Sequence, residues 1–474
     1  MPDELAPEIC VIGGGPGGIA LSIAAANHGL PVVLVEKTGL GGADLREGSV
    51  PSAAIRAAAG LHEALRRGPA FGVTGAPLQV NMARVQDHVG QVAEAAAANV
   101  SRERLEAFGV TVIAAEARFA DRRTVIAGEA RIRARAFVIA TGSLPIVPSY
   151  AGLDGLDTVD ISSVLEAGRK PAHLIVLGAS PRGLELAQAL NRLGIDASVI
   201  DGGPALAGED PELVAPLLDR LRAEGIRIRE RAGIVGFARR KGGVRATVRD
   251  DGEETVVDGS HLLVMTARSP NVAGLGLDAA GIEHGPTGIV VDQRLRTTNK
   301  RVYALGDAVG GPLSASRAEH HARRVLAAIA GSRGGRDADG GVPFVIHTDP
   351  GLARVGLSEA EARVRHRMLR VLRVPFTEND LSQAERATAG FVKVIATDKG
   401  RILGAGITGR DAGEMIALWS LALSAGLGIE DLRAFPAPYP SRAGIAHRVA
   451  IAFDGPGRAP LRRTGAFSFL RRSG

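Results

Sequence analysis

Residues 9–36 read ICVIGGGPGGIALSIAAANHGLPVVLVE, and this stretch decides the fold. The run 9–12 is short and wholly apolar, as a strand buried on both faces of a parallel sheet requires. A glycine-rich turn follows, then an alanine-rich helix pattern to about His28, and then a second apolar run, 31–35, that ends at Glu36. The order strand, glycine turn, helix, strand is typical of a unit that binds a dinucleotide.

Each glycine of this turn has its own role in such a unit. Gly13 allows a tight turn, Gly15 lets the backbone approach a pyrophosphate, and Gly18 lets the helix pack closely. The helix N-terminus faces the phosphates, and Glu36, 18 residues after Gly18, can accept a hydrogen bond from a ribose hydroxyl. This context favours a binding site over a glycine turn that is only structural.

The pattern returns at 173–201. A strand over 173–177 and a second strand that ends at Asp201 enclose a helix and the turn Gly178-Ala179-Ser180-Pro181-Arg182-Gly183. Ser180 replaces the middle glycine, so the approach to a pyrophosphate is tighter. Two glycines and no arginine follow Asp201, which favours a free 2′-hydroxyl and therefore NADH over NADPH. Two dinucleotides in one chain indicate hydride transfer from a nicotinamide to a flavin.

The composition is that of a folded protein of two to four domains. The 474 residues are 45% hydrophobic and 23% charged, with a net charge of +6. Aromatic residues make up only 3%, which argues against a stacking platform for nucleic acid. The single cysteine, Cys10, excludes an intrachain disulfide and a thiolate zinc site, and within its apolar run we expect it to be inert. With no signal peptide and no apolar stretch that could span a bilayer, we expect a cytoplasmic protein.

The C-terminal part has a different character. A Gly/Arg/Asp-rich stretch at 331–341 is interpreted as a linker. After it, strand and helix patterns alternate and predict an α+β domain: strands over 391–396 and 402–407, helices over 359–365 and 412–425. From Gly455 to Gly474 there are five arginines and no acid, which favours a solvated tail over one that binds an acidic partner.

Further segments resemble the FAD-dependent pyridine nucleotide-disulfide oxidoreductases, a family that includes dihydrolipoamide dehydrogenase, glutathione reductase and mercuric reductase. The resemblance covers about residues 8–452. Besides the glycine turns, it rests on Glu116-Ala117-Arg118-Phe119, Ala140-Thr141-Gly142-Ser143, Thr266-Ala267-Arg268-Ser269-Pro270-Asn271, Tyr303-Ala304-Leu305-Gly306-Asp307, Thr348-Asp349-Pro350 and Val355-Gly356-Leu357-Ser358-Glu359. Residues 116–119 look like the family's adenine-side segment, and Asp307 looks like the aspartate that contacts the flavin ribityl chain. Residues 348–350 and 355–359 look like the opening of the dimerisation domain.

The resemblance implies an α/β fold with two Rossmann-like dinucleotide-binding domains, for FAD and NAD, and a C-terminal α+β dimerisation domain. The expected boundaries are 1–150 and 272–335 for FAD, 151–271 for NAD(P), 341–454 for dimerisation and 455–474 for a basic flexible tail. The residues assigned to FAD are Gly13, Gly15, Gly18, Glu36, Lys37, Gly42, Ala117, Ala140, Thr141, Gly142, Gly306 and Asp307. Those assigned to the nicotinamide nucleotide are Gly178, Ser180, Gly183, Asp201 and Ala267. His320, His321 and His447 lack a third ligand at suitable spacing, so no metal site is expected.

The departures from the family decide the function. Members with a redox disulfide carry GGTCxxxGCxPSK after the first Rossmann unit, and here residues 41–53 read GGADLREGSVPSA. The cysteine positions therefore hold Asp44 and Ser49, and the lysine position holds Ala53. The HPxxxE motif, which supplies a His–Glu pair from the partner subunit, is matched by Tyr439-Pro440-Ser441-Arg442-Ala443-Gly444, and the C-terminal cysteine pair of mercuric reductases is missing. Electron transfer to a dithiol needs a thiolate and a base, so we expect no reduction of disulfides or Hg²⁺ by the family route.

The residues at the altered positions leave alternatives open. By the resemblance, Ser49 lies nearest the flavin ring, where it tunes the ring by a hydrogen bond or makes room for an acceptor; it could also cap the helix that starts near Pro51. Asp44, if ionised beside a flavin, would lower its reduction potential; pairing with Arg46 in a solvent-facing loop is the alternative.

Three further side chains are candidates for catalysis. Glu185 matches the family's glutamate near the nicotinamide–flavin contact, and our hypothesis is that Arg182, three residues earlier, replaces the lysine that holds it. A solvated surface arginine is the alternative. Tyr439 could donate a proton or hydrogen bond to an acceptor, or it could pack in the subunit interface.

The sequence thus predicts an FAD-dependent NAD(P)H oxidoreductase that transfers two electrons through flavin alone. NADH, or NADPH, is the hydride donor, and the acceptor is a small molecule: a quinone, a dye-like compound, oxygen or a second nicotinamide nucleotide. The chain is expected to form a homodimer without nucleic-acid or membrane partners. The alternative is a catalytically degenerate FAD-binding dimer that serves as a sensor or binding module.

Overall fold

The computed structural model describes residues 4–75, 78–160, 163–164, 170–250, 252–331 and 340–455. The chain divides into two compact units, Met1–Asp349 and Pro350–Gly474. Most of the expected linker and nearly all of the basic tail lie outside the described residues.

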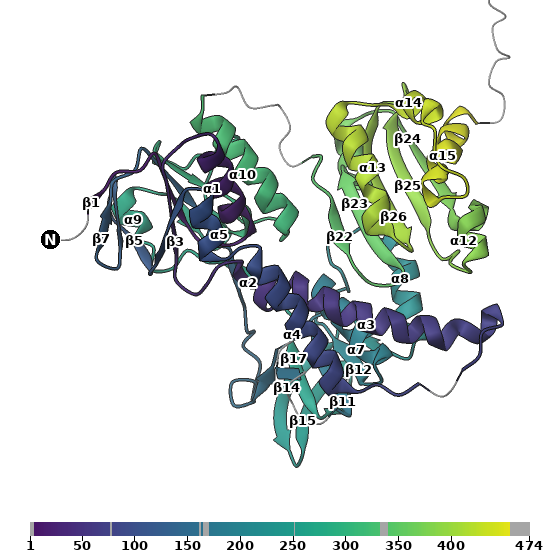
Figure 1. Cartoon of the computed structure of the whole chain (residues 1–474). Helices are drawn as coiled ribbons and strands as arrows, with labels where there is room; N and C mark the ends of the chain where they lie inside the picture. Colours follow the sequence, from purple (N-terminus) through teal and green to yellow (C-terminus); the bar gives the residue numbers. More distant parts are fainter. Residues whose placement is uncertain are drawn as a thin grey trace, which may run out of the picture. The chain divides into compact units, whose positions relative to one another are not determined.

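The first unit contains a five-stranded parallel sheet with the strand order β21-β8-β2-β3-β4 (Figure 1). Its strands are β2 (Ile9–Ile12), β3 (Val32–Glu36), β4 (Val110–Ala114), β8 (Ala136–Ile139) and β21 (Val302–Ala304). The central strand β2 is buried on both faces, as its unbroken apolar run predicts. The chain order reverses beside β2, since β3 pairs with one of its edges and β8 with the other.

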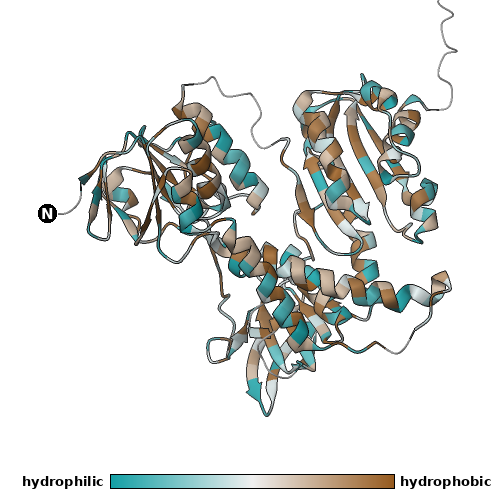
Figure 2. Cartoon of the chain, viewed as in Figure 1, coloured by the Kyte–Doolittle hydropathy of each residue, from teal (hydrophilic) through white to brown (hydrophobic). Residues whose placement is uncertain are grey.

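Alternate residues of β2 enter two different cores. Ile9 and Val11 pack in the cluster that includes residues of α1 (Pro16–Asn27) and α10 (Ala315–Ile329). Cys10 and Ile12 pack on the opposite face, against a smaller four-stranded sheet. That sheet has the order β1-β7-β6-β5, and its strands are β1 (Glu4–Leu5), β5 (Ala117–Asp121), β6 (Thr124–Ala127) and β7 (Ala130–Ile132). Figure 2 shows the resulting apolar colouring of the central strands.

A second parallel sheet in the first unit repeats this plan, with the order β10-β17-β11-β12-β13. Its strands are β10 (Thr158–Val159), β11 (His173–Leu177), β12 (Asp196–Ile200), β13 (Arg227–Arg229) and β17 (His261–Val264). One face packs on an antiparallel sheet of β14 (Gly233–Arg240), β15 (Gly243–Asp250) and β16 (Glu253–Gly259). The helices that connect strands of this parallel sheet are α7 (Pro181–Arg192) and α8 (Pro211–Ala223). The two strand–turn–helix–strand units predicted from the sequence are therefore confirmed.

Further elements of the first unit surround and connect the two parallel sheets. The longest is α3 (Ser49–Arg67), which packs against α7 and α4. The remaining ones are α2 (Gly42–Arg46), η1 (Gly68–Phe71), α4 (Met82–Ala98), α5 (Arg102–Ala107), β9 (Ser143–Pro145), β18 (Arg268–Pro270), α9 (Leu277–Ala280), β19 (His284–Gly285), β20 (Gly288–Ile289), η2 (Gly306–Val309) and β22 (Phe344–Ile346).

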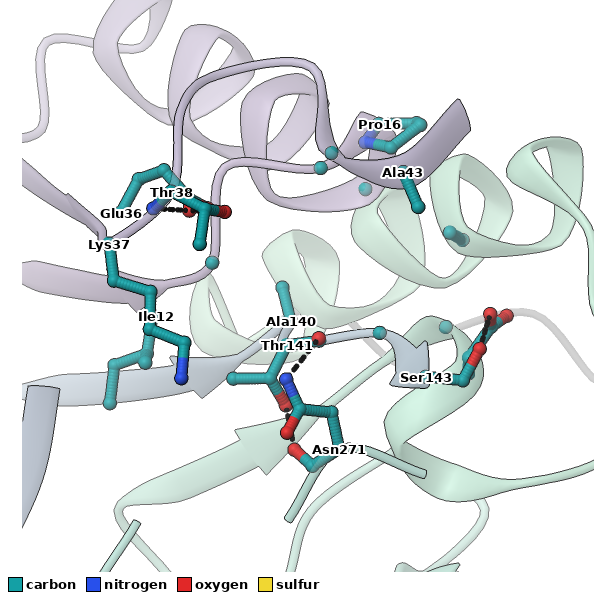
Figure 3. A pocket seen from close by; sticks show the side chains of 18 of the residues that line it. Ile12, Pro16, Glu36, Lys37, Thr38, Ala43, Ala140, Thr141, Ser143 and Asn271 are labelled. Carbon is teal, nitrogen blue, oxygen red and sulfur yellow. Dashed lines mark hydrogen bonds between the residues drawn. The ribbon is translucent and has the colours of Figure 1, made fainter. Parts of the chain in front are cut away.

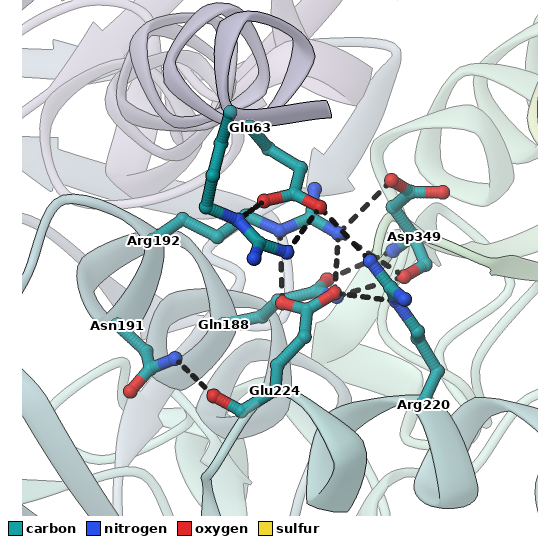
Figure 4. Close-up of polar contacts among 8 residues, drawn as sticks. Glu63, Gln188, Asn191, Arg192, Arg220, Glu224 and Asp349 are labelled. Atoms are coloured by element: carbon teal, nitrogen blue, oxygen red, sulfur yellow. Dashed lines mark hydrogen bonds and ion pairs between the residues drawn. The ribbon is translucent and has the colours of Figure 1, made fainter. Parts of the chain in front are cut away.

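A buried network of charges joins α3 to α7 and α8 (Figure 4). Arg192 on α7 forms a bidentate pair with Glu224, with Nε–Oε2 and Nη2–Oε1 distances of 2.9 and 2.7 Å. Arg220 on α8 bridges Glu224 to Glu63 on α3, at 2.7 and 3.0 Å. Although burial opposes it, the hydrogen bond from Arg66 holds the pKa of Glu63 below its usual value. These contacts hold α3 against α7 and α8.

The second unit contains antiparallel strands in the order β23-β26-β25-β24. They are β23 (Gly351–Gly356), β24 (Leu369–Pro375), β25 (Phe391–Thr397) and β26 (Ile402–Gly409). α13 (Ala412–Ala425) packs on β23 and β26, and α15 (Ile445–Asp454) on β24 (Figure 1). The short elements are α11 (Glu359–Arg365), η3 (Phe376–Glu378), α12 (Asp380–Ala384), α14 (Ile429–Ala434) and η4 (Arg442–Gly444). The predicted α+β character of this part is confirmed, with α11 and α13 at their expected bounds.

Candidate active site

The first glycine turn lies where the strand order reverses. β2 ends at Ile12 and β8 ends at Ile139, so the turn at Gly13 and the segment 140–142 meet at the same edge of the sheet. Gly13 has a φ of +111°, and a Cβ there would stand 2.4 Å from the carbonyl oxygen of Ala140. Ligands of open α/β sheets bind in the crevice at such a reversal, so this is the expected place for a dinucleotide.

Gly15 and Gly18 divide the remaining roles as expected of a pyrophosphate cradle. A Cβ on Gly18 would lie 2.0 Å from the carbonyl oxygen of Gly13, so this position serves the close packing of α1 on the turn. A Cβ on Gly15, in contrast, would meet no protein atom within 4 Å, although Gly15 lines the cavity at this edge. The backbone at Gly15 is therefore open to a ligand at the N-terminus of α1, and the cradle fits a pyrophosphate.

Glu36 receives the backbone N–H of Gly14 at 2.6 Å and that of Thr38 at 2.7 Å. Burial raises the pKa of this carboxyl, but the hydrogen bonds from Thr38, Gly14 and Gly39 outweigh it, so the pKa lies below its usual value. Glu36 is thus an ionised acceptor at the end of β3, as a ribose-binding acid must be. Lys37, beside it, forms a half-exposed ion pair with Glu116 at 3.1 Å.

One cavity collects most of the predicted FAD residues (Figure 3). Glu36 and Lys37 lie on one side of it and Ser143 on the other. The predicted residues that line it are Gly13, Gly15, Glu36, Lys37, Gly42, Ala117, Ala140, Thr141, Gly142, Gly306 and Asp307. Gly18 alone of the set is not a lining residue, because it packs against the turn. A cavity that runs from the carboxylate of Glu36 past the open glycine turn fits an extended dinucleotide such as FAD.

Asp307 lies at the end of this cavity opposite Glu36 and accepts a hydrogen bond from Ser143 Oγ at 2.7 Å. Burial raises the pKa of Asp307, and the Asp44 charge adds to the rise. Arg268 donates from Nε to Ser143 Oγ at 2.9 Å, and burial lowers its pKa. Buried His321 on α10 accepts the backbone N–H of Gly306 at its Nδ1, which fixes the turn before Asp307.

The second glycine turn has the same geometry in the second parallel sheet. Gly178 has a φ of +112°, and a Cβ there would lie 2.4 Å from the carbonyl oxygen of Met265. A Cβ on Gly183 would lie 2.2 Å from the carbonyl oxygen of Gly178. Asp201 accepts the backbone N–H of Ala179 at 2.7 Å, just as Glu36 accepts that of Gly14.

Ser180, at the position of the missing middle glycine, is the N-cap of α7. Its Oγ accepts the backbone N–H of Gly183 at 3.2 Å and donates to the carbonyl oxygen of Met265 at 2.6 Å. The hydroxyl is therefore bound within the turn and strengthens the helix start. Ala267 lies three residues after the end of β17, and its carbonyl oxygen accepts the backbone N–H of Ile146.

The two positions of the missing cysteines are joined by a hydrogen bond. Ser49 Oγ donates to Asp44 Oδ1 at 2.7 Å, and Arg182 Nη2 donates to the same oxygen at 2.9 Å. Two of the alternatives considered from the sequence are wrong. Ser49 is not an N-cap, since α3 starts at Ser49 itself and Gly48 precedes it without a side-chain bond. Asp44 does not pair with Arg46, which instead binds the carbonyl oxygen of Gly39.

The hypothesis that Arg182 holds Glu185 is also wrong. Glu185 is 6% exposed and pairs with Arg56 at 3.2 Å, and it accepts the backbone N–H of His347 at 2.6 Å. Burial raises the pKa of Glu185, and among the charges that oppose the rise Arg56 is the largest and Arg182 the smallest. Arg182 pairs with Asp44 at 2.9 Å instead, and the cation that pairs with Glu185 is Arg56, three residues after Ala53.

Tyr439 lies in the second unit. Its side chain is 82% exposed, and its hydroxyl donates to Asp380 Oδ2 at 3.1 Å. Cys10 is fully buried in β2, and burial raises the pKa of its thiol to about 12. Over the described ranges, no three histidine, cysteine or acidic side chains group to hold a metal ion. Nor does any helix in those ranges have the length and apolar character needed to cross a membrane.

Comparison with known proteins decides the family. The sequence profile of the pyridine nucleotide-disulphide oxidoreductases matches residues 7–322, and the profile of that family's dimerisation domain matches residues 342–449. The chain belongs to this family. It is 32% identical to the dihydrolipoyl dehydrogenase of Geobacillus stearothermophilus over 451 residues, which cover 94% of this chain and 95% of that protein. It is 33% identical to a mercuric reductase of Streptomyces lividans over 474 residues, which cover 94% and 96%.

A solved structure gives the same result for the fold. LpdA from Mycobacterium tuberculosis matches with a TM-score of 0.85 at 26% identity, over 94% of this chain and 99% of that one. As a pyridine nucleotide-disulphide oxidoreductase, the chain has an FAD domain, an NAD domain and a C-terminal dimerisation domain. The resemblance to the family and the fold class are thus confirmed. The family is named for a disulfide, but this sequence holds a single cysteine, Cys10, which is buried in the core.

Several residues that shape the site were not among the sequence-based candidates. Arg56 is the clearest example. The sequence offered one indication of its role, which is that a cation stands three residues after Ala53, the family's lysine position. In the sequence, Ser143 and Arg268 appear only as parts of family segments. The hydrogen bonds from Ser143 to Asp307 and from Arg268 to Ser143 join chain positions too far apart for spacing to reveal.

Proposed function

We propose that this family member is an FAD-dependent NAD(P)H oxidoreductase that transfers two electrons through flavin alone to a small acceptor, such as a quinone, oxygen or a second nicotinamide nucleotide. The observation that carries the proposal is the Ser49–Asp44 hydrogen bond of 2.7 Å at the positions of the family's redox cysteines. Neither a hydroxyl nor a carboxylate forms a bond that two electrons can break and remake. Disulfide and mercuric substrates are therefore not expected.

Cys10 offers no substitute for the missing pair. It is the chain's one cysteine, it is fully buried in the central strand, and its pKa of about 12 keeps it a thiol. The thiolate is the reactive form of cysteine, and a core thiol cannot reach a substrate.

FAD, when bound, supplies two-electron chemistry between the nicotinamide and the acceptor. The residues that would hold it are those of the cavity: Gly15 at the pyrophosphate, Glu36 at a ribose hydroxyl and Asp307 at the opposite end. We assign Asp201 to the ribose of NADH, because its oxygens already accept two backbone N–H groups and no cation follows it. Glu185 on α7 and Arg56 on α3 form a largely buried pair, and the family has a glutamate and a lysine at the positions of Glu185 and Ala53.

The domain boundaries predicted from the sequence, a homodimer formed through the C-terminal domain and a role for Tyr439 in it belong to the same proposal. The exposure of Tyr439 supports a position at a surface between subunits, and its hydrogen bond to Asp380 orients its ring.

An anaerobic mixing experiment tests the proposed function. The purified yellow protein is mixed with NADH, and in a second sample with NADPH, and the flavin absorbance near 450 nm is followed. We expect NADH to bleach the flavin rapidly and NADPH to do so more slowly, because the Asp201 carboxylate repels a 2′-phosphate. Protein that stays yellow with both nucleotides would contradict the proposal and favour the binding or sensing module, a role with which the Ser180 substitution is compatible.

A further inference from the structure

We propose that Asp44 and Arg182 form a charge-balancing pair that replaces the dithiol and sets how easily the bound flavin is reduced. Arg182 does not line the cavity itself, and it acts by its charge, which offsets that of Asp44. The proposal rests on the FAD-binding part of the proposed function and adds to it a role for two residues at the altered positions.

The pair joins the two halves of the first unit. Asp44 lies on the short helix α2 of the FAD part, and Arg182 in the first turn of α7 in the nicotinamide part. Their 2.9 Å contact uses the carboxylate oxygen that also accepts the Ser49 hydroxyl. Both side chains are about one-third exposed or less, with exposed fractions of 32% for Arg182 and 28% for Asp44.

The loop between the former cysteine positions is shaped for the guanidinium. A Cβ on Gly48 would stand 2.6 Å from Nη2 of Arg182 and 2.8 Å from the Cα of Asp44. Any other residue at position 48 would therefore push the arginine away from its carboxylate. Glycine here lets the charged group lie directly against the backbone that links Asp44 to Ser49.

Both charges act on the end of the cavity opposite Glu36. Asp44 itself lines the cavity, together with Arg268 and Asp307. The field of Arg182 adds to the burial that lowers the pKa of Arg268, and the field of Asp44 adds to the burial that raises the pKa of Asp307. The fields of Asp307, Asp44 and Glu47 also reach Arg268 and oppose the fall of its pKa. A flavin ring at this end would feel the same two charges.

The signs of the expected effects follow from electrostatics. Two-electron reduction of a flavin at neutral pH adds negative charge, so a nearby anion disfavours reduction and a nearby cation favours it. While Asp44 and Arg182 are paired, their effects largely cancel. Loss of Arg182 alone would leave Asp44 uncompensated and lower the reduction potential, and loss of Asp44 alone would raise it.

A double-mutant cycle on the FAD-bound protein tests the pair. The potential of the flavin is measured by titration against a reference dye with a chemical reductant, without NADH, for Arg182→Met, Asp44→Asn and the double variant. At a fixed potential we expect the ratio of reduced to oxidised flavin to fall about tenfold in Arg182→Met and to rise about tenfold in Asp44→Asn; for a two-electron couple each change is about 30 mV. The double variant is expected near the original value, and Arg182→Lys should restore most of it.

The controls separate tuning from structure. Arg245→Met removes a cation from the exposed ion pair with Asp258 on β15 and β16, and it should leave the potential unchanged. Shifts of the same sign in both single variants, or no shift in either, would overturn the proposal, and so would variants that can no longer hold FAD. A wild-type protein that NADH fails to reduce would end the proposed function but would leave this cycle and its outcome intact.

Discussion

Gly15→Val is expected to abolish most FAD binding while leaving the chain folded. The backbone at Gly15 has φ −79° and ψ −177°, which any residue adopts, and a Cβ there meets no protein atom within 4 Å. The added side chain would instead fill the space at the N-terminus of α1 that we assign to the pyrophosphate. Overpacking of this kind costs about 3 kcal/mol, so affinity should fall roughly 100-fold.

The measurement is the flavin content of the purified protein together with FAD affinity by fluorescence quenching of the apoprotein. Gly13→Val is the matched control from the same turn. With its φ of +111° and a Cβ contact of 2.4 Å, it should lower the melting temperature of the apoprotein, which Gly15→Val should not. Full flavin content in Gly15→Val would show that the cofactor does not lie against this turn.

Arg192→Met is expected to destabilise the first unit by about 3 kcal/mol. The side chains of Arg192 and Glu224 are only 8% and 4% exposed, and Arg192 holds both oxygens of Glu224 as well as Asp349 Oδ2 (Figure 4). The variant leaves Glu224 with fewer partners in a place where water cannot replace them. This expected loss of stability lies at the lower end of the range for broken buried ion pairs, because Arg220 still contacts Glu224.

The free energy of unfolding in urea measures this effect. Arg222→Met, which removes a cation from the more exposed pair with Glu230, should cost less than about 1 kcal/mol. The double variant Arg192→Met/Glu224→Leu should regain much of the loss, since it leaves no unpaired charge at the centre. Equal stability of Arg192→Met and Arg222→Met would mean that the network does not hold α7 to α3 and α8.

The strands and turns of the fold could be predicted because their signals are local. The unbroken apolar runs of β2 and β11 specify strands buried on both faces, and the residues at 13, 15 and 18 sit where the turn geometry demands them. The antiparallel sheet of β14, β15 and β16 was not predicted. In β15 the exposed arginines alternate with buried residues, but in β14 Arg239 and Arg240 are consecutive and both exposed, so the period-two signal of this sheet is interrupted.

The altered redox site could be predicted only in part. That Asp44 and Ser49 replace the cysteines is visible in the sequence, but their hydrogen bond to each other depends on the path of the chain between them. The partner of Glu185 was assigned to the wrong arginine, because spacing along one helix placed Arg182 on its face. Tertiary packing of α3 against α7 brings Arg56 closer, and Asp44 takes Arg182 instead. The Arg56–Glu185 and Arg182–Asp44 pairs join residues 129 and 138 positions apart, and such contacts produce no periodic pattern in the sequence.

The most direct test of a redox centre without sulfur is an electron count. Anaerobic titration of the purified holoprotein with dithionite should reach full reduction at two electrons per FAD, with no long-wavelength absorbance at the midpoint. An uptake of four electrons per FAD, with a thiolate-to-flavin charge-transfer band after the first two, would contradict the account.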